Sequence, residues 1–160
     1  MKAVAWAKRA AALGLAFLLG FAVAGYAVRD VRPRSFLALD RCDHCWSSNQ
    51  IMGLLGSMAM QHTPGMIPVT VLETDRSIAM RMPDLSRRRL HFVIVPKRDI
   101  LDAADLGPGD EPYLVDAFAV IGRLVREHGL TDYQVLTKGP GDQSVRYLHF
   151  HLISKNPGRR

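Results

Sequence analysis

Two histidines lie two residues apart near the C-terminal end of the chain, in the run Tyr147-Leu148-His149-Phe150-His151. Side chains alternate between the two faces of a β-strand, so Tyr147, His149 and His151 are predicted to share one face. Leu148 and Phe150 are predicted to face a hydrophobic core. Histidine serves in acid–base catalysis, in nucleophilic catalysis and as a metal ligand. The spacing alone is therefore compatible with catalysis, with a pair of metal ligands or with an ordinary exposed sheet face.

The elements that must position these histidines are mostly short and extended. β-branched and aromatic runs bounded by turn residues predict five strands, at Val69–Glu73, Ser77–Met82, His91–Val95, Tyr133–Leu136 and Val145–Ile153. Apolar residues at helical spacing predict a short helix over Met52–Met60 and a long one over Glu111–His128, which ends at Gly129. We expect an α+β domain with a mostly antiparallel five-stranded sheet and one long helix.

The N-terminal part of the chain is apolar and carries no charge from Ala10 to Val28. A helix over these residues would span about 28 Å, close to the hydrocarbon thickness of a bilayer. Ala22-Val23-Ala24 resembles a cleavage site, so a removed signal peptide is an alternative to an uncleaved anchor. We favour the anchor, because the apolar run continues past that site. The short basic head resembles that of a bacterial signal-anchor, which predicts a single-pass inner-membrane protein with a periplasmic domain.

The expected organisation is a basic head at 1–9, a transmembrane helix at 10–28, a linker at 29–40, the folded domain at 41–155 and a basic tail at 156–160. The formal net charge is +6 and the isoelectric point is near 9.7. Such a charge is explained by solubility alone, since arginines cluster at 87–89 and at the C-terminal end. The alternative is attraction to anions such as phosphorylated substrates, nucleic acid or acidic lipid headgroups. Basic stripes interleaved with aromatics and zinc-finger spacings are missing from the sequence, so nucleic acid is not an expected partner.

Cys42 and Cys45 form a C-x-x-C motif. No histidine follows Cys45 directly, which argues against covalent haem attachment. Two thiolates make half of a zinc site, so a structural disulfide or free thiols are the simpler interpretation.

Several motifs together resemble the histidine-triad family, whose pattern is H-φ-H-φ-H-φ-φ. The resemblance covers about 115 residues, from Cys42 to Ser154. Its parts, in chain order, are Cys42 with Cys45, the strand His91–Lys97, the turn Asp105-Leu106, the run Gln143–Val145 and the triad-like run Tyr147–Ile153. The resemblance implies an α+β roll that forms a homodimer and cleaves phosphoanhydride or related bonds at the α-phosphate of nucleotides.

The resemblance also implies roles for individual residues. His149 matches the nucleophilic middle histidine, which can attack phosphorus while neutral and leave again when water attacks. His151 matches the histidine that stabilises charge on the phosphate, and Ser144 matches a catalytic polar residue. His91, Gln143, Lys138 and Tyr147 are the remaining candidates for substrate contacts. His91 matches a histidine at the edge of the family's site, and Gln143 matches a polar residue that contacts the phosphate or the leaving group. Lys138 offers a cation, and Tyr147 occupies the position of the first triad histidine.

Two positions depart from the family pattern. Tyr147 replaces the first histidine of the triad, and Asp99 stands where zinc-containing relatives have the histidine of P-K-x-H. These two positions and the two cysteines form the zinc site in those relatives, so we expect no structural zinc and no other cofactor. The loop before Gln143 is also about two residues shorter than the family's.

The leading hypothesis is a membrane-tethered hydrolase or nucleotidyl transferase that acts on a nucleotide or a nucleotide-lipid through a phosphohistidine on His149. An anchored histidine-triad domain is similar to the bacterial CDP-diacylglycerol pyrophosphatases, whose motif is also followed by a serine, as Ser154 follows here. The alternative is a catalytically silent membrane protein that binds nucleotides or other anions. A third hypothesis is a metal-binding envelope protein that uses the cysteines and histidines.

Overall fold

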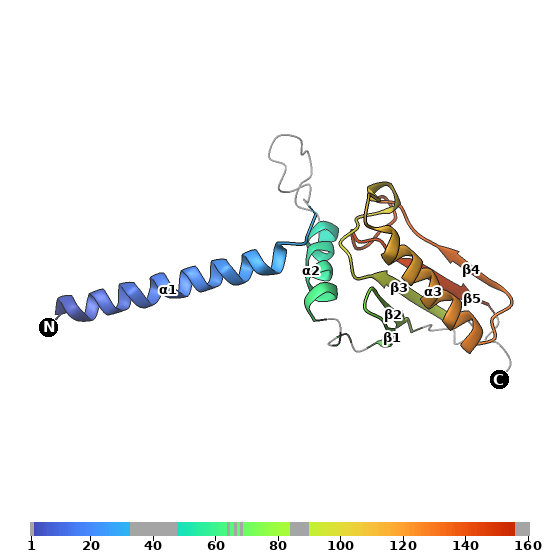
Figure 1. The fold of residues 1–160 in the computed structure, drawn as a ribbon, viewed down its shortest axis with the longest axis horizontal. Helices are drawn as coiled ribbons and strands as arrows, with labels where there is room; N and C mark the ends of the chain where they lie inside the picture. The colour runs from blue at the N-terminus through green and yellow to red at the C-terminus, as the bar shows by residue number, and fades with distance from the viewer. Residues whose placement is uncertain are drawn as a thin grey trace. The chain divides into compact units, whose positions relative to one another are not determined.

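The computed structural model of the chain describes residues 2–32, 48–63, 65, 67, 69–83 and 90–155 (Figure 1). These residues belong to two compact units, Met1–Val31 and Arg32–Arg160. Cys42, Cys45, the arginine run at 87–89 and the tail at 156–160 lie outside the described residues, so the expectations placed on them stay predictions.

The first unit contains helix α1, Lys2–Val28. Its apolar side chains, among them Leu13, Phe17 and Phe21, are exposed. The stretch Lys8–Val28 contains an 18-residue window with a mean hydropathy of 2.1 and is long enough to cross a membrane. A signal sequence near the N-terminus would have the same length and composition.

The second unit is built on a five-stranded sheet in the order β1-β2-β3-β5-β4, in which every neighbouring pair is antiparallel. The strands are β1 Thr70–Glu73, β2 Ser77–Arg81, β3 Leu90–Pro96, β4 Tyr133–Leu136 and β5 Phe150–Ser154. The predicted α+β class and the mostly antiparallel sheet are confirmed.

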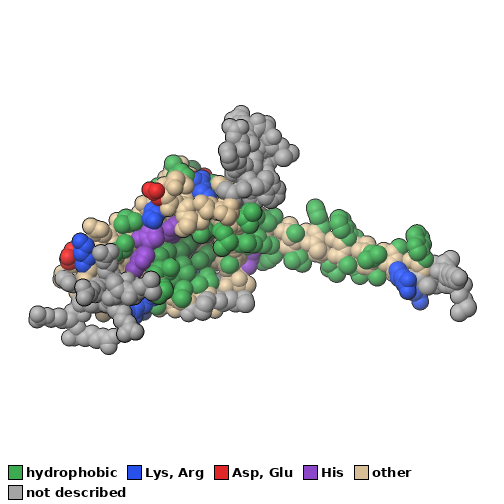
Figure 2. Space-filling model, turned by 180° about the vertical axis from the view of Figure 1, so that it is seen from behind, with side chains coloured by type: hydrophobic (Ala, Val, Ile, Leu, Met, Phe, Trp, Pro, Cys, Tyr) green, Lys and Arg blue, Asp and Glu red, His purple; other side chains and the backbone are tan. Residues whose placement is uncertain are grey.

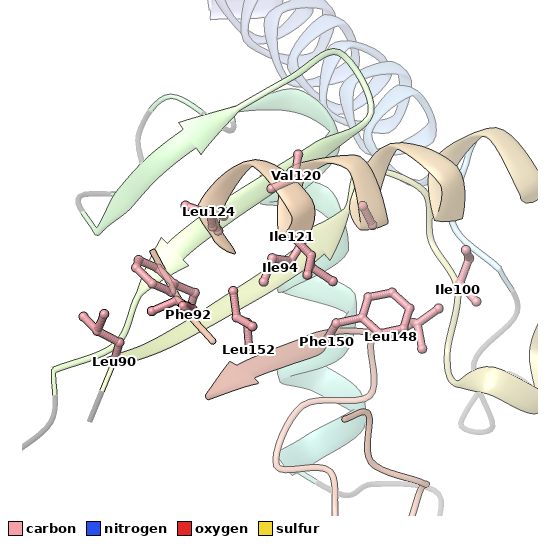
Figure 3. Packing of buried hydrophobic residues seen from close by; sticks show 13 residues of the cluster. Leu90, Phe92, Ile94, Ile100, Val120, Ile121, Leu124, Leu148, Phe150 and Leu152 are labelled. Atoms are coloured by element: carbon pink, nitrogen blue, oxygen red, sulfur yellow. The ribbon is translucent and has the colours of Figure 1, made fainter. Parts of the chain in front are cut away.

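Helix α3, Glu111–Glu127, packs on one face of the sheet through Ala117, Val120, Ile121 and Leu124. These side chains meet alternate strand residues, which include Phe92, Ile94, Phe150 and Leu152, in the main core (Figure 3). The helix ends where Gly129 takes a φ of +58° and Leu130 N–H donates to the Val125 carbonyl. This is a Schellman ending, and the end predicted from Gly129 is confirmed.

The opposite face of the sheet carries a smaller cluster of Ile78, Val93, Val95 and Tyr147, against which Met60 and Met80 pack. Helix α2, Ser48–His62, contributes Met60 and flanks this face. It is longer than the predicted helix over Met52–Met60. Gly53 lets α2 lie directly against the backbone at Arg146, because a Cβ at this position would be 2.5 Å from the Arg146 carbonyl oxygen.

The prediction of a strand over Val145–Ile153 is wrong at its beginning, because β5 begins at Phe150. The residues before Phe150 make other hydrogen bonds. Arg146 N–H donates to the Asn49 carbonyl, and Leu148 N–H donates to the Ile100 carbonyl at 2.7 Å. The alternation nevertheless persists through the irregular segment: Leu148, Phe150 and Leu152 face the main core, while Tyr147, His149 and His151 face away from it.

Candidate active site

His149 is held by the backbone immediately before it. Its Nδ1 atom lies 2.7 Å from the Tyr147 carbonyl oxygen. A carbonyl only accepts hydrogen bonds, so Nδ1 carries the proton and a neutral ring has its lone pair on Nε2. Thr137 Oγ1 donates to the His149 carbonyl at 2.8 Å and ties this residue to the end of β4. The half-buried ring is thereby oriented with Nε2 as its available nucleophilic atom.

His151 lies on β5 opposite Val93 of β3, and His91 lies two residues earlier on β3, opposite Ile153. His91 Nε2 and His151 Nδ1 are 2.9 Å apart, so one of them donates a proton to the other. The ring of His151 is also 4.8 Å from that of His149, edge to face. The structure thus brings the three histidines into one continuous group.

Burial lowers the pKa of His151 from 6.5 to about 4, helped by the nearby positive charges of His149, His91 and Lys138. His151 is therefore neutral at pH 7. Its Nε2 atom is buried and has no hydrogen-bond partner among the described residues. An unsatisfied buried nitrogen is costly, and such atoms are frequent where a ligand supplies the missing partner.

The other predicted site residues have different surroundings. Ser144 is exposed and lines the same groove as His149 and His151. Lys138 is exposed and close enough to His151 to influence its pKa. Gln143 is buried away from the groove, and its Nε2 donates to the Leu101 carbonyl at 3.2 Å.

Tyr147 and Asp99 are the two departures from the zinc-site pattern, and each makes a hydrogen bond to another part of the protein. The Tyr147 hydroxyl donates to the Pro96 carbonyl at 2.8 Å. The Asp99 carboxylate is buried and accepts the Arg32 backbone N–H at 2.6 Å. A zinc ligand must offer its lone pairs to the metal, so these two positions do not fit a zinc site.

Arg32 follows the first unit directly and lies in an acidic socket of the domain. Its guanidinium contacts the carboxylates of Asp105 and Asp110, and the second of these also accepts Arg98 Nε at 2.9 Å. Burial opposes the charged form of Asp110, but hydrogen bonds from Gly107 N–H, Arg32 and Arg98 outweigh it and lower the pKa of this carboxyl. Sequence analysis missed the socket, because its parts are up to 78 residues apart.

Asn49 on α2 is a second residue that sequence analysis missed. Its Nδ2 donates to the Gln143 carbonyl at 3.1 Å, and its own carbonyl accepts the Arg146 N–H at 3.2 Å. Asn49 thus holds both ends of the turn that contains Ser144. No sequence signal pointed to it, because an asparagine in the first turn of a helix normally indicates a cap.

A group of histidine side chains lies at the edge of a hydrophobic surface (Figure 2). A groove of about 580 Å³ runs there between α2 and the sheet face opposite α3, and Ser144, His149 and His151 belong to its lining. Ligand sites of proteins are commonly about 300–1,000 Å³ in volume. The arrangement can therefore place a substrate of ordinary size beside Nε2 of His149.

Solved structures of histidine-triad proteins share this architecture. A HIT family hydrolase from Legionella pneumophila is 26% identical, with a TM-score of 0.50 over 63% of this chain and 91% of that one. A histidine triad protein from Clostridium difficile and a HIT family hydrolase from Clostridium thermocellum are 23% and 20% identical. Each has a TM-score of 0.52, and the match covers 66% of this chain and 90% of that one. At these identities the last two structures show only that the fold is shared. Comparison with curated proteins found no match.

The antiparallel sheet, helix α3 on one of its faces and the grouped histidines define a protein of the histidine-triad class. Residues 60–159 match the family described as "Scavenger mRNA decapping enzyme C-term binding". The chain belongs to that family, within the histidine-triad superfamily. The family and the hydrolase neighbours support an enzyme of histidine-triad type with a general nucleotide-processing function.

Proposed function

We propose that this protein is a hydrolase or nucleotidyl transferase that cleaves a phosphoanhydride, with Nε2 of His149 as the nucleophile. The observation that supports this most directly is the 2.7 Å contact between His149 Nδ1 and the Tyr147 carbonyl. This contact orients the ring and keeps the proton on the nitrogen that does not react.

In the first step, Nε2 attacks the α-phosphorus of the substrate. The N–P bond forms as the P–O bond to the leaving group breaks, and the leaving group departs with that electron pair. In the second step, water attacks the phosphohistidine, the N–P electron pair returns to Nε2, and the proton of the water passes to solvent. An acceptor alcohol or phosphate in place of water would make the reaction a transfer.

His151 is the proposed hydrogen-bond partner of the transferring phosphoryl group. When His91 Nε2–H donates to His151 Nδ1, the neutral His151 ring carries its proton on Nε2. A small rotation of the ring would direct this N–H at a phosphoryl oxygen. Ser144, on the same groove, would donate to the leaving group, and Lys138 would attract the anionic substrate.

The proposal includes a membrane tether. Helix α1 is long and apolar enough to span a bilayer, and its apolar side chains are exposed. We place the protein in a bacterial inner membrane with the domain in the periplasm. Alkaline phosphatase and green fluorescent protein fused to the C-terminus test the orientation, since the first is active only outside the cytoplasm.

A homodimer is the proposed assembly. Val115 and Phe118 on α3 are 70% and 53% exposed, and Tyr133 on the edge strand β4 is 44% exposed. Large exposed apolar side chains on a helix beside an unpaired strand edge are typical of a self-association surface. Analytical ultracentrifugation of wild type and Phe118→Glu tests this, with dimer expected for the first and monomer for the second.

The test of the chemistry is covalent trapping. Wild type incubated with an α-³²P-labelled nucleotide is expected to acquire acid-labile, base-stable label. His149→Ala is expected to lose it, while His62→Ala, which changes a histidine that does not line the groove, keeps it. Nucleotide binding without label in wild type would instead establish the catalytically silent alternative.

A further inference from the structure

The groove beside the histidines is polar at one end and apolar along its body. The polar side chains among the described lining residues belong to Ser144, Tyr147, His149 and His151. The rest of the described lining is aliphatic or thioether in character, with Met52, Leu55, Met60, Met80 and Met82 as its larger members. Polarity therefore changes sharply from the reacting end to the body of the groove.

The body of the groove is poorly suited to a sugar or a base. Sites that hold such groups place polar side chains to satisfy hydroxyl and ring-edge hydrogen bonds. Among the described lining residues, the one hydroxyl apart from that of Ser144 belongs to Tyr147, and it donates its proton to the Pro96 carbonyl. The strand backbones that form the floor are paired in the sheet, which leaves few donors for a ligand.

The side chains of the groove are instead suited to a flexible hydrocarbon. Methionine is unbranched and polarizable, so four methionines can adapt to a chain of variable shape. Met52 and Leu55 on α2 remain 51% and 53% exposed although they line the groove. An alkyl chain in the groove would remove this apolar surface from water and stabilise the complex in proportion to the area covered.

We propose that the groove binds the hydrocarbon chain of an amphiphilic phosphoanhydride, with the phosphorus at the histidine end and the chain along α2. This inference rests on the proposed function, because it names the substrate class of the same site. Charge and polarity are complementary along its length: the phosphate meets Ser144, the histidines and the nearby Lys138, and the chain meets the methionines.

Binding of simple alkyl phosphates tests the proposal without any turnover. Full-length His149→Ala in nanodiscs is titrated with ethyl, butyl, hexyl and octyl phosphate and with AMP, with empty nanodiscs as the blank. Each methylene group that leaves water can tighten binding by up to about fourfold. Octyl phosphate is therefore expected to bind roughly tenfold or more tightly than butyl phosphate, and more tightly than AMP.

Two further substitutions on α2 supply the matched comparison. Leu55 lines the groove and Ile51 does not, although both are apolar and partly exposed on the same helix. Leu55→Gln, added to His149→Ala, is expected to flatten the dependence of Kd on chain length. Ile51→Gln in the same background is expected to leave that dependence unchanged. Circular dichroism verifies that both variants are folded.

The outcomes separate this inference from the proposed function. Affinity that does not depend on chain length, or AMP binding more tightly than octyl phosphate, overturns the amphiphile proposal. The groove would then be occupied by a nucleoside, by another part of this chain or by a partner protein. Phosphohistidine trapped from a soluble nucleotide would leave the catalytic proposal standing in that case. Chain-length dependence without any phosphohistidine would support the amphiphile and refute the chemistry.

Discussion

The Nε2 atom of His91 lies 2.9 Å from Nδ1 of His151, so the imidazoles of two neighbouring strands share one proton. Protonating both rings would put two donors face to face in a half-buried site. At least one ring of the pair is therefore neutral, and burial, which lowers the pKa of His151 to about 4, makes His151 that ring. In this state His151 can act as a hydrogen-bond donor to phosphate without adding a full charge.

The first prediction concerns stability against pH. Unfolded His151 takes up a proton near pH 6.5, whereas the folded protein takes it up only near pH 4. Between these values the unfolded state binds more protons. The contribution of His151 to the free energy of unfolding is therefore complete above pH 6.5 and is lost as the pH falls towards 4. Thermal unfolding at pH 7.0 and 4.5 is expected to show a smaller drop in Tm for His151→Asn than for wild type. An equal drop would show that His151 is not linked to unfolding.

The second prediction concerns Asn49, whose hydrogen bonds hold both ends of the turn that contains Ser144. Asn49→Ala removes the hydrogen bond to the Gln143 carbonyl and should destabilise the fold by about 1 kcal/mol. The turn with Ser144 should also become less ordered, which lowers kcat more than it raises KM. Gln61→Ala is the control, because the Gln61 side chain donates its hydrogen bond to Ser57 within the same helix. Equal kinetic losses in the two variants would contradict a positioning role for Asn49.

The third prediction concerns the close approach at Gly53. Gly53→Ala puts a Cβ 2.5 Å from the Arg146 carbonyl oxygen, which forces α2 away from the Arg146 backbone. The free energy of unfolding should fall by about 1–3 kcal/mol. Gly56→Ala is the matched change, because its Cβ would meet Val145 at an ordinary 3.9 Å. Alanine has a higher helix propensity than glycine, so this variant should be as stable as the wild type or more stable by up to about 1 kcal/mol. Urea unfolding of both proteins measures the difference.

The fourth prediction concerns the acidic socket around Asp110. Asp110→Asn leaves Arg32 and Arg98 without their buried partner and is expected to destabilise the domain by about 3–5 kcal/mol. Arg123→Gln breaks an exposed pair with Glu127 and should change stability by less than about 0.5 kcal/mol. Chemical denaturation at pH 7 distinguishes the two, and comparable losses would show that the socket contributes no more than a surface pair.

Most of the fold was accessible to sequence reasoning because it depends on local patterns. The two-residue alternation at Leu148, Phe150 and Leu152 predicted which side chains enter the core. The helical spacing before Gly129 predicted α3 and its end. The beginning of β5 was misplaced because Arg146 and Leu148 bond to Asn49 and Ile100, and partners so distant leave no local signal.

The sequence by itself determined the class of the protein and the residues capable of its chemistry, since both follow from residue type and short-range spacing. Only the tertiary structure decided which ring nitrogen of His149 is available, how His91 and His151 share a proton, and what surrounds them. The groove, the Asn49 contacts and the Arg32 socket are assembled from segments up to 99 residues apart, which is the separation of Met52 and His151. Their existence depends on how α2 and the sheet pack together, and packing is a property of the folded chain as a whole.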